Sequence, residues 1–286
     1  MAVQRGLESA RPPRKRLFTD PFAPSFLPLS WRTALAASRF GAVRVAIEAA
    51  YDLVGGPGPR PSAIARTKLI DDMVEQIAPS VEQLVLLGAG YDTRPYRLAC
   101  LTGHRVFEVD HPDTQAVKRP ALLRAGIEPS GVVFVPVDFE TDNLATALGN
   151  AGYDPDRPAL YVWEGVTQYL SAEAVDSTLA EIHKLSKSGS HLIFTYVDSA
   201  VIGNNAPQFP EADKWLRGVE RRGEPWTFGI APATLSGFLA DRGYRLLDDL
   251  SAAEAADRYF APLGRSERAS GLYRIAAATV YPTGQV

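Results

Sequence analysis

The sequence predicts an α/β protein whose core is a doubly wound, mainly parallel, seven-stranded sheet. The first observation behind this fold class is an apolar run at 84–87 that stops at a Gly-x-Gly turn, Gly88 and Gly90, as a strand buried on both faces does. The second is an apolar run at 105–110, which closes on the carboxylate of Asp110 about twenty residues after the turn. The third is a steady alternation of apolar runs with helical patterns, which is typical of a sheet covered on both faces.

The alternation places each strand and helix by its residue range. Strands are predicted at 84–87, 105–110, 132–136, 159–163, 190–196, 244–250 and 271–281. Helices are predicted between them at 94–101, 112–125, 142–150, 171–187 and 232–242. Because ligands of such sheets bind outside the carboxyl ends of the strands, we expect the functional residues on the turns that follow the strands.

The residues before the first strand predict a helical cap. Two helices are expected, at 33–53 and 62–78, with a Gly/Pro loop at 55–61 between them. Residues 1–32 are rich in proline and arginine and then turn aromatic, and they cannot form one continuous helix. This arm is either a frayed tail whose aromatic residues dock on the body or a flap over a ligand site. We expect one structural domain, with arm and cap at 1–80 and a core at 81–286.

Composition excludes several classes of protein. The chain has 286 residues, of which 46% are hydrophobic and 22% charged, as in ordinary globular proteins. A net charge of −3 gives no basic footprint for nucleic acid. The single cysteine, Cys100, excludes an internal disulfide and a cysteine-rich zinc site, and we expect it to pack within the helix at 94–101. No His/Asp/Glu cluster has the spacing of metal ligands. Without a long apolar run or a leader pattern, we expect a cytoplasmic protein without a membrane partner.

Acidic residues at three strand ends indicate which nucleotide-like ligand binds. Asp92 would repel a pyrophosphate where a dinucleotide would approach, whereas it suits a cationic group such as the amine or sulfonium of S-adenosylmethionine. Glu164 ends a buried strand and needs a partner, which a ligand ammonium would supply. Asp138 and Phe139 follow the third strand, where they could hold an adenine; equally, Asp138 could cap the next helix.

These segments carry a family resemblance. They are Leu-Gly-Ala-Gly-Tyr-Asp-Thr-Arg-Pro-Tyr-Arg-Leu at 87–98, Phe-Glu-Val-Asp-His-Pro at 107–112 with Lys118, Trp-Glu-Gly-Val-Thr-Gln-Tyr-Leu at 163–170, Asp-Pro-Phe-Ala at 20–23 and Ile-Ala-Arg-Thr-Lys at 64–68. Together they resemble the leucine carboxyl methyltransferase-like family of class I S-adenosylmethionine-dependent methyltransferases, over most of the chain. The resemblance implies the Rossmann-like sheet of that class.

The resemblance also implies a cofactor site. Arg66 would hold the methionine carboxylate of S-adenosylmethionine, for which a bidentate donor is suited; otherwise it is a surface arginine. Asp110 would take the ribose hydroxyls and Glu164 would lie near the methionine amine. The full set implied to bind the cofactor is Arg66, Gly88, Ala89, Gly90, Asp92, Arg94, Asp110, His111, Asp138, Phe139, Glu164 and Gly165.

The methyl acceptor is not carried over, because the connection at 197–231 matches nothing in family members that methylate a protein C-terminus. Such a long connection at the carboxyl edge of the sheet is usually functional, so we expect a short helical insertion that forms an acceptor pocket. No catalytic residue is assigned. Candidates for the pocket wall are Tyr169, Tyr196, Arg221, Trp226 and Phe228, each of which could instead serve packing.

The residues favour an O-methyltransferase that acts on the carboxyl group of a small molecule. A carboxylate acceptor needs no base, whereas a phenol or alcohol does, and none of the four histidines lies in the insertion. The alternatives are a phenol or hydroxyl acceptor, a nicotinamide-dependent oxidoreductase and a non-catalytic cofactor-binding protein. The sequence does not indicate an oligomeric state.

Overall fold

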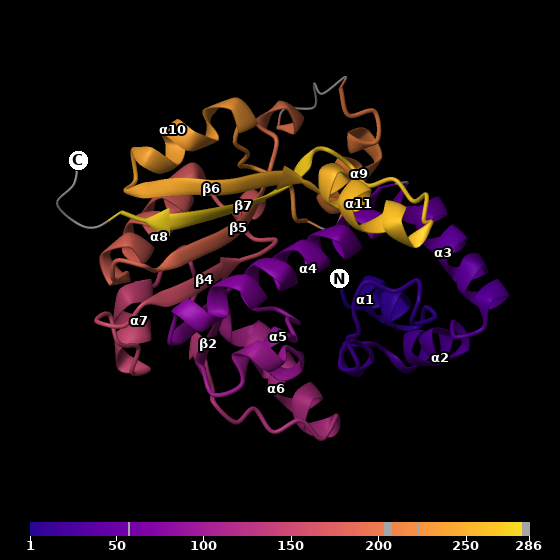
Figure 1. Cartoon of the computed structure of the whole chain (residues 1–286), viewed down its shortest axis with the longest axis horizontal. Coiled ribbons are helices and arrows are strands. Elements are labelled where there is room, and N and C mark those ends of the chain that lie inside the picture. Colours follow the sequence, from indigo (N-terminus) through magenta and orange to yellow (C-terminus); the bar gives the residue numbers. More distant parts are fainter. Residues whose placement is uncertain (57, 203–207, 222, 282–286) are drawn as a thin grey trace.

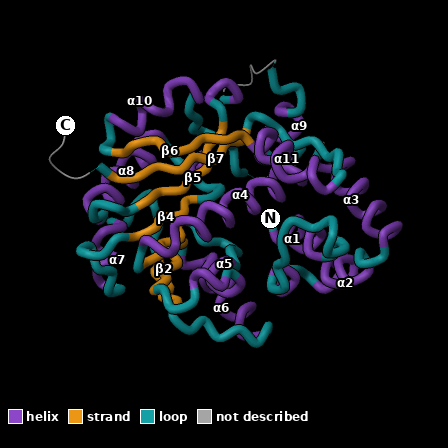
Figure 2. Tube along the Cα trace, in the orientation of Figure 1, coloured by secondary structure: helices purple, strands orange, loops and turns teal. Residues whose placement is uncertain are grey.

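The computed structural model describes residues 1–56, 58–202, 208–221 and 223–281. It contains the predicted seven-stranded sheet, with strand order β3-β2-β1-β4-β5-β7-β6 (Figure 1, Figure 2). The strands are β1 (Gln83–Leu87), β2 (Arg105–Asp110), β3 (Val132–Pro136), β4 (Ala159–Trp163), β5 (His191–Val197), β6 (Tyr244–Ser251) and β7 (Tyr273–Val280). The pairs among β1 to β5 are parallel, and β7 runs antiparallel between β5 and β6.

Helices cover both faces of the sheet because its central strands are apolar on both sides. Every residue of β1 and β4 is buried. Alternate side chains point to opposite faces, so Leu84 and Leu86 join one core cluster while Val85 and Leu87 join the other. The first cluster packs under α4 (Pro59–Ile77) and α11 (Ala252–Phe260), and the second under α7 (Leu144–Asn150), α8 (Ala172–Leu185) and α10 (Leu235–Ala240).

The remaining helices lie at the carboxyl edge of the parallel strands or flank the sheet. They are α1 (Ala2–Ser9), α2 (Leu29–Ala37), α3 (Gly41–Gly55), α5 (Arg94–Arg97), α6 (Pro112–Arg124) and α9 (Ala212–Glu220). Figure 1 shows α1, α2 and α3 in indigo and violet, standing beside α9 and α11. Within the described residues, no helix is both long enough and apolar enough to cross a lipid bilayer.

Three predicted helices have other boundaries in the structure. The helix expected at 33–53 is two helices, α2 and α3, because the Ser38 hydroxyl bonds to the carbonyl of Leu35 and Phe40 is extended. The helix expected at 94–101 ends after Arg97, since Leu98 is extended, so Cys100 lies in a separate 3₁₀ turn. The helix expected at 232–242 starts with a 3₁₀ turn, and α10 begins only at Leu235.

One further helix begins earlier than predicted, and another was not predicted at all. Helix α4 begins at Pro59 rather than Ser62, because Gly58 at φ +105° precedes a proline that suits the first helical position. Helix α11 was not predicted, although Ser251 and Glu254 form a capping box at its start. The predicted short helix of the insertion is α9, whereas residues 203–207 and 222 of that insertion lie outside the described residues.

The arm is not a frayed tail, because its first residues form α1 and pack on the body, but its aromatic residues dock there as predicted: Phe18 packs on the core and Phe26 stacks on Tyr91. Leu7 and Glu8 of α1 are fully buried. The carboxylate of Glu8 lies 2.7 Å from Arg265 Nη1 and accepts a hydrogen bond of 2.7 Å from the backbone of Leu17. These contacts tie α1 to the C-terminal part of the chain.

Candidate active site

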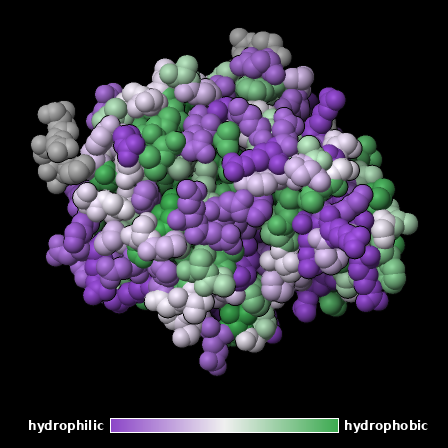
Figure 3. All heavy atoms as spheres, in the orientation of Figure 1, coloured by the Kyte–Doolittle hydropathy of each residue, from purple (hydrophilic) through white to green (hydrophobic). Residues whose placement is uncertain are grey.

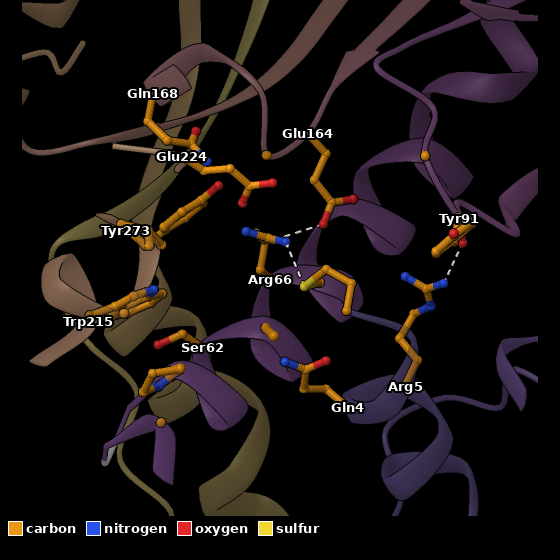
Figure 4. A pocket seen from close by; sticks show the side chains of 18 of the residues that line it. Gln4, Arg5, Ser62, Arg66, Tyr91, Glu164, Gln168, Trp215, Glu224 and Tyr273 are labelled. Atoms are coloured by element: carbon orange, nitrogen blue, oxygen red, sulfur yellow. Dashed lines mark hydrogen bonds and ion pairs between the residues drawn. The ribbon is translucent and has the colours of Figure 1, made fainter. Parts of the chain in front are cut away.

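A cavity of about 1170 Å³ opens at the carboxyl edge of the parallel strands. Its floor is the turn after β1 and the end of β4, and its walls come from α2, α3, α4 and α9. Figure 4 shows Arg66 near the centre, with Tyr273 and Trp215 on one side and Arg5 and Tyr91 on the other. The predicted residues that line it are Arg66, Gly88, Ala89, Gly90, Asp92, Glu164, Gly165, Tyr169, Arg221 and Trp226. The structure therefore brings together residues that the chain separates by more than a hundred positions.

The glycine turn is held against the end of β2. Gly88 and Gly90 have φ values of +65° and +42°, which favour glycine. The amides of Gly88 and Ala89 both donate to the carbonyl of Val109, at 2.8 and 3.1 Å. The amide of Gly90 donates to Asp110 Oδ2, and the amide of His111 donates to Oδ1 of the same carboxylate. Asp110 thus lies directly beside the turn, as its spacing predicts.

An ionic network joins the cavity lining to buried residues beneath it: Asp92, Glu164 and Arg66 line the cavity, whereas Arg94 and Asp71 do not. Arg94 Nη1 contacts Asp92 Oδ2 at 2.6 Å and Glu164 Oε2 at 2.7 Å, while its Nε contacts Asp71 Oδ1 at 2.8 Å. Arg66 Nε contacts Glu164 Oε1 at 2.8 Å. Arg94 and Asp71 are almost completely buried. Each carboxylate of the network is therefore neutralised by a guanidinium before any ligand binds.

This network corrects one expectation about Glu164 and Asp92 and lowers the pKa of both carboxyls. Glu164 and Asp92 were expected to have a ligand cation as their partner, but arginines already balance both. Burial alone would raise the pKa of Glu164; the charges of Arg94 and Arg66 outweigh that effect and lower it from 4.5 to about 2. Burial would also raise the pKa of the Asp92 carboxyl, but the charge of Arg94 outweighs it, and this pKa is lowered as well. Both side chains are anions at neutral pH.

Arg66 is a wall residue of the cavity rather than a surface arginine. It is 7% exposed, its guanidinium lies 4.6 Å from the centre of the Tyr273 ring, and its Nη2 lies 3.1 Å from Met1 Sδ. The charge of Glu164 and the Tyr273 ring hold the guanidinium at the cavity, where it can take an anionic group.

The N-terminal arm is bonded to the glycine turn, a feature that the spacing of residues did not predict. Asp20 is fully buried, and its Oδ2 accepts hydrogen bonds from Arg5 Nε at 2.7 Å and Thr93 Oγ1 at 2.8 Å. Arg5 Nη2 donates to the carbonyl of Tyr91, whose ring stacks on Phe26 at 4.9 Å. The only signal for this contact was the Asp-Pro-Phe-Ala segment at 20–23.

Several predicted site residues do not line the cavity. Tyr196 is fully buried and its hydroxyl bonds to Asp249, while Phe228 packs in the core beneath α10. Asp138 accepts from the amide of Glu140 in a local turn, but the next helix, α7, is capped by Asn143, so the helix-capping alternative is wrong. The others outside the lining are Arg94, Asp110, His111 and Phe139. Arg94 acts from below the floor, whereas the other three lie at the ends of β2 and β3.

Comparison with known proteins assigns the chain to a family. The model of the family "Leucine carboxyl methyltransferase" matches residues 1–183. The chain belongs to this family. A candidate S-adenosyl-L-methionine-dependent methyltransferase of Frankia alni is 30% identical over 245 residues, which is 74% of this chain and 85% of the relative. A second Frankia alni protein with the same description is 36% identical over 218 residues, 76% of this chain and 68% of the relative.

A solved structure agrees in fold. A candidate methyltransferase from Thermobifida fusca has a TM-score of 0.60 and 18% identity, covering 96% of this chain and 97% of that one. The protein is thus an S-adenosylmethionine-dependent methyltransferase with the fold that the sequence predicted. Family membership also excludes the nicotinamide-dependent oxidoreductase alternative.

The residues of this methyltransferase fit its cofactor. The side chain of Val166 packs against Gly88, whereas a Cβ atom at Gly90 would meet only the Gly88 carbonyl oxygen, at 3.8 Å, so the turn is open at Gly90. Arg66 can take the carboxylate of the methionine end, and Asp110 has acceptor capacity left for ribose hydroxyls. When bound, S-adenosylmethionine supplies an electrophilic methyl group; the chain's own residues bind and orient it.

Replacing Asp20 by asparagine is expected to weaken binding of S-adenosylhomocysteine by about tenfold, because a neutral amide holds Arg5 and Thr93 less strongly than a charged acceptor does. Isothermal calorimetry measures the affinity and urea unfolding the stability. Tyr244→Phe is the matched control: it removes a buried hydrogen bond of 2.7 Å to the Leu179 carbonyl, in the core cluster under α8. It should lower stability without changing affinity. Equal cofactor affinity in the two variants would contradict this role of Asp20.

Proposed function

We propose that the methyltransferase transfers the methyl group to a carboxyl oxygen of a small molecule. The observation that carries this proposal is the chemistry of the cavity wall: among its described residues there is no histidine and no cysteine. A carboxylate acceptor is ionised at neutral pH and needs no base. A phenol or an alcohol would require one.

The carboxylates of the wall are poor bases. Asp92 and Glu164 lie against Arg94, and the pKa of each is lowered. Glu224 is exposed, and a solvated carboxylate is a weak base toward a phenol or alcohol. The hydroxyl of Tyr273 does not supply a phenolate, because burial raises its pKa. The cavity is therefore suited to an acceptor that arrives already ionised.

Methyl transfer from a sulfonium to a carboxylate is a displacement in which two opposite charges disappear together. Little new charge develops, so the chain contributes by aligning the reactants and excluding water. Arg66 and the glycine turn would fix the cofactor from one side. The aromatic rings of Trp215, Trp226 and Tyr273 would exclude water from the other.

The test is a panel of acceptors matched in shape. 3-Phenylpropanoic acid, 3-phenylpropanol and 4-propylphenol are incubated with the methyltransferase and methyl-labelled S-adenosylmethionine at pH 6 to 9. We expect label only in the acid, at a rate that varies less than about twofold across this range, because a carboxylic acid is ionised throughout it. A rate that rises about tenfold per pH unit, with label in the phenol, would favour the phenol alternative.

A further inference from the structure

Helix α3 turns an apolar face toward the cavity. None of its fifteen residues is buried, although helices of globular proteins normally bury their apolar stripe. Ile47, Ala50, Tyr51 and Val54 recur at the spacing of one helical face, and all four line the cavity. Val54 is 80% exposed. At the right-hand edge of the space-filling view, where Figure 1 places α3, hydrophobic residues lie among hydrophilic ones (Figure 3).

Polar contacts, rather than apolar packing, fasten this helix to the body. Arg60 donates twice to the carboxylate of Asp52, at 3.0 and 2.8 Å. Lys214 Nζ of α9 donates to the carbonyl of Leu53 at 2.6 Å, and Gln4 Nε2 of α1 donates to the hydroxyl of Tyr51 at 2.6 Å. The apolar face is therefore held open toward the cavity by its neighbours instead of being used to pack against them.

The opposite walls of this part of the cavity are also apolar and lead to the cofactor residues. Trp31 of α2 and Val219 of α9 line it together with Trp215. The Trp215 ring stacks on Tyr273 with centroids 6.2 Å apart, and Tyr273 lies under Arg66. One continuous space thus runs from the cofactor end to the face of α3. Its volume of about 1170 Å³ exceeds the range of roughly 300–1,000 Å³ that is usual for one drug-sized ligand.

We infer that the acceptor acid carries an extended apolar body, which packs against Ile47, Ala50 and Val54 while its carboxylate reaches the cofactor. This inference rests on the proposed function, since it extends the same cavity. Burying one methylene group strengthens binding by about fourfold (about 0.8 kcal/mol). The chain length of the acid should therefore control its affinity.

The test titrates butanoic, hexanoic, octanoic and decanoic acid into the methyltransferase saturated with S-adenosylhomocysteine. We expect affinity to rise about two- to fourfold per methylene group up to decanoic acid. Formation of methyl esters is assayed separately with S-adenosylmethionine. Chain-length-dependent binding without ester formation would overturn the carboxyl-methylation proposal and keep the apolar subsite. Ester formation with affinity independent of chain length would overturn the apolar subsite alone.

Two variants on α3 test where the alkyl chain of the acceptor binds. Val54→Asp places a carboxylate on the cavity face and should weaken binding of decanoic acid at least tenfold, with S-adenosylhomocysteine affinity unchanged. Val45→Asp is the matched control, because Val45 is 61% exposed on the same helix and does not line the cavity. Equal effects of the two variants would overturn the inference. A change of oligomeric state on Val54→Asp, seen by sedimentation, would overturn it in favour of a second copy covering this face.

Discussion

Replacing Arg94 by methionine is expected to lower the free energy of unfolding by about 3–5 kcal/mol, because removing one partner of a buried ion pair leaves the other uncompensated. Arg94 contacts Asp71, Asp92 and Glu164, and its side chain is 3% exposed. The loss of Arg94 would leave Asp92 without an arginine partner, whereas Glu164 keeps Arg66 and Asp71 keeps Arg97. Urea unfolding at pH 7 measures the change, and cofactor affinity should fall with it because the floor shapes the glycine turn.

The control for this variant is an exposed ion pair. Arg157 and Glu82 lie 2.7 Å apart, but their side chains are 56% and 54% exposed. Exposed pairs contribute about 0–1 kcal/mol, so Arg157→Met should change stability by less than about 1 kcal/mol. A loss in Arg94→Met no greater than that of the control would contradict the assigned role of the buried network.

The same network predicts how stability depends on pH. The pKa of Glu164 is about 2 in the folded protein against an ordinary 4.5, so the unfolded chain binds this proton more readily. Its contribution, roughly 3 kcal/mol, is present in full above about pH 5 and is lost as the pH falls toward 2. Without Arg94 the pKa is less depressed, so the stability of Arg94→Met should fall less steeply between pH 5 and 3. Parallel curves for the two proteins would argue against this coupling.

Replacing Gly88 by alanine is the second change with a large expected effect. Its Cβ would collide with the side chain of Val166, and φ is +65°. The turn must shift, so we expect S-adenosylhomocysteine affinity to fall by a factor of a hundred or more, about 3 kcal/mol, together with a loss of stability of about 1–2 kcal/mol. Calorimetry and urea unfolding measure the two quantities.

Gly103→Ala separates backbone strain from the collision. Gly103 has φ +88°, and a Cβ there meets nothing within 4 Å. This variant should show the loss of stability from strain without a loss of cofactor affinity. Adding Val166→Ala to Gly88→Ala removes the colliding methyl group and should restore part of the affinity. Undiminished cofactor affinity in Gly88→Ala alone would show that the turn does not approach the cofactor.

Local spacing was enough to predict the sheet and the proximity of the glycine turn to Asp110. The turn at Gly88 and the carboxylate of Asp110 are joined by adjacent parallel strands, so their proximity follows from one βαβ unit. The position of Glu164 beside the glycine turn could be predicted from the strand order, since Leu87 pairs with Trp163. These features depend on apolar runs and short connections that any reader of the sequence can see.

The remaining parts of the site depend on contacts between distant segments. Asp20 reaches Thr93 across 73 positions, and no periodic pattern records such a contact. The face of α3 follows helical spacing, but its pattern cannot say that the face meets a cavity rather than a core. Tyr196 and Phe228 show the reverse case, in which aromatic residues near the pocket pack into the core. Aromatic composition alone does not distinguish a wall from a core.

The most direct test of the proposed carboxyl methylation identifies the oxygen atom that receives the methyl group. The methyltransferase is incubated with labelled S-adenosylmethionine and a mixture of decanoic acid, decan-1-ol and 4-hexylphenol, and the products are treated with alkali. We expect label in decanoic acid alone, released quantitatively as methanol because the product is an ester. Label that resists alkali, in an ether of the phenol or the alcohol, would contradict it.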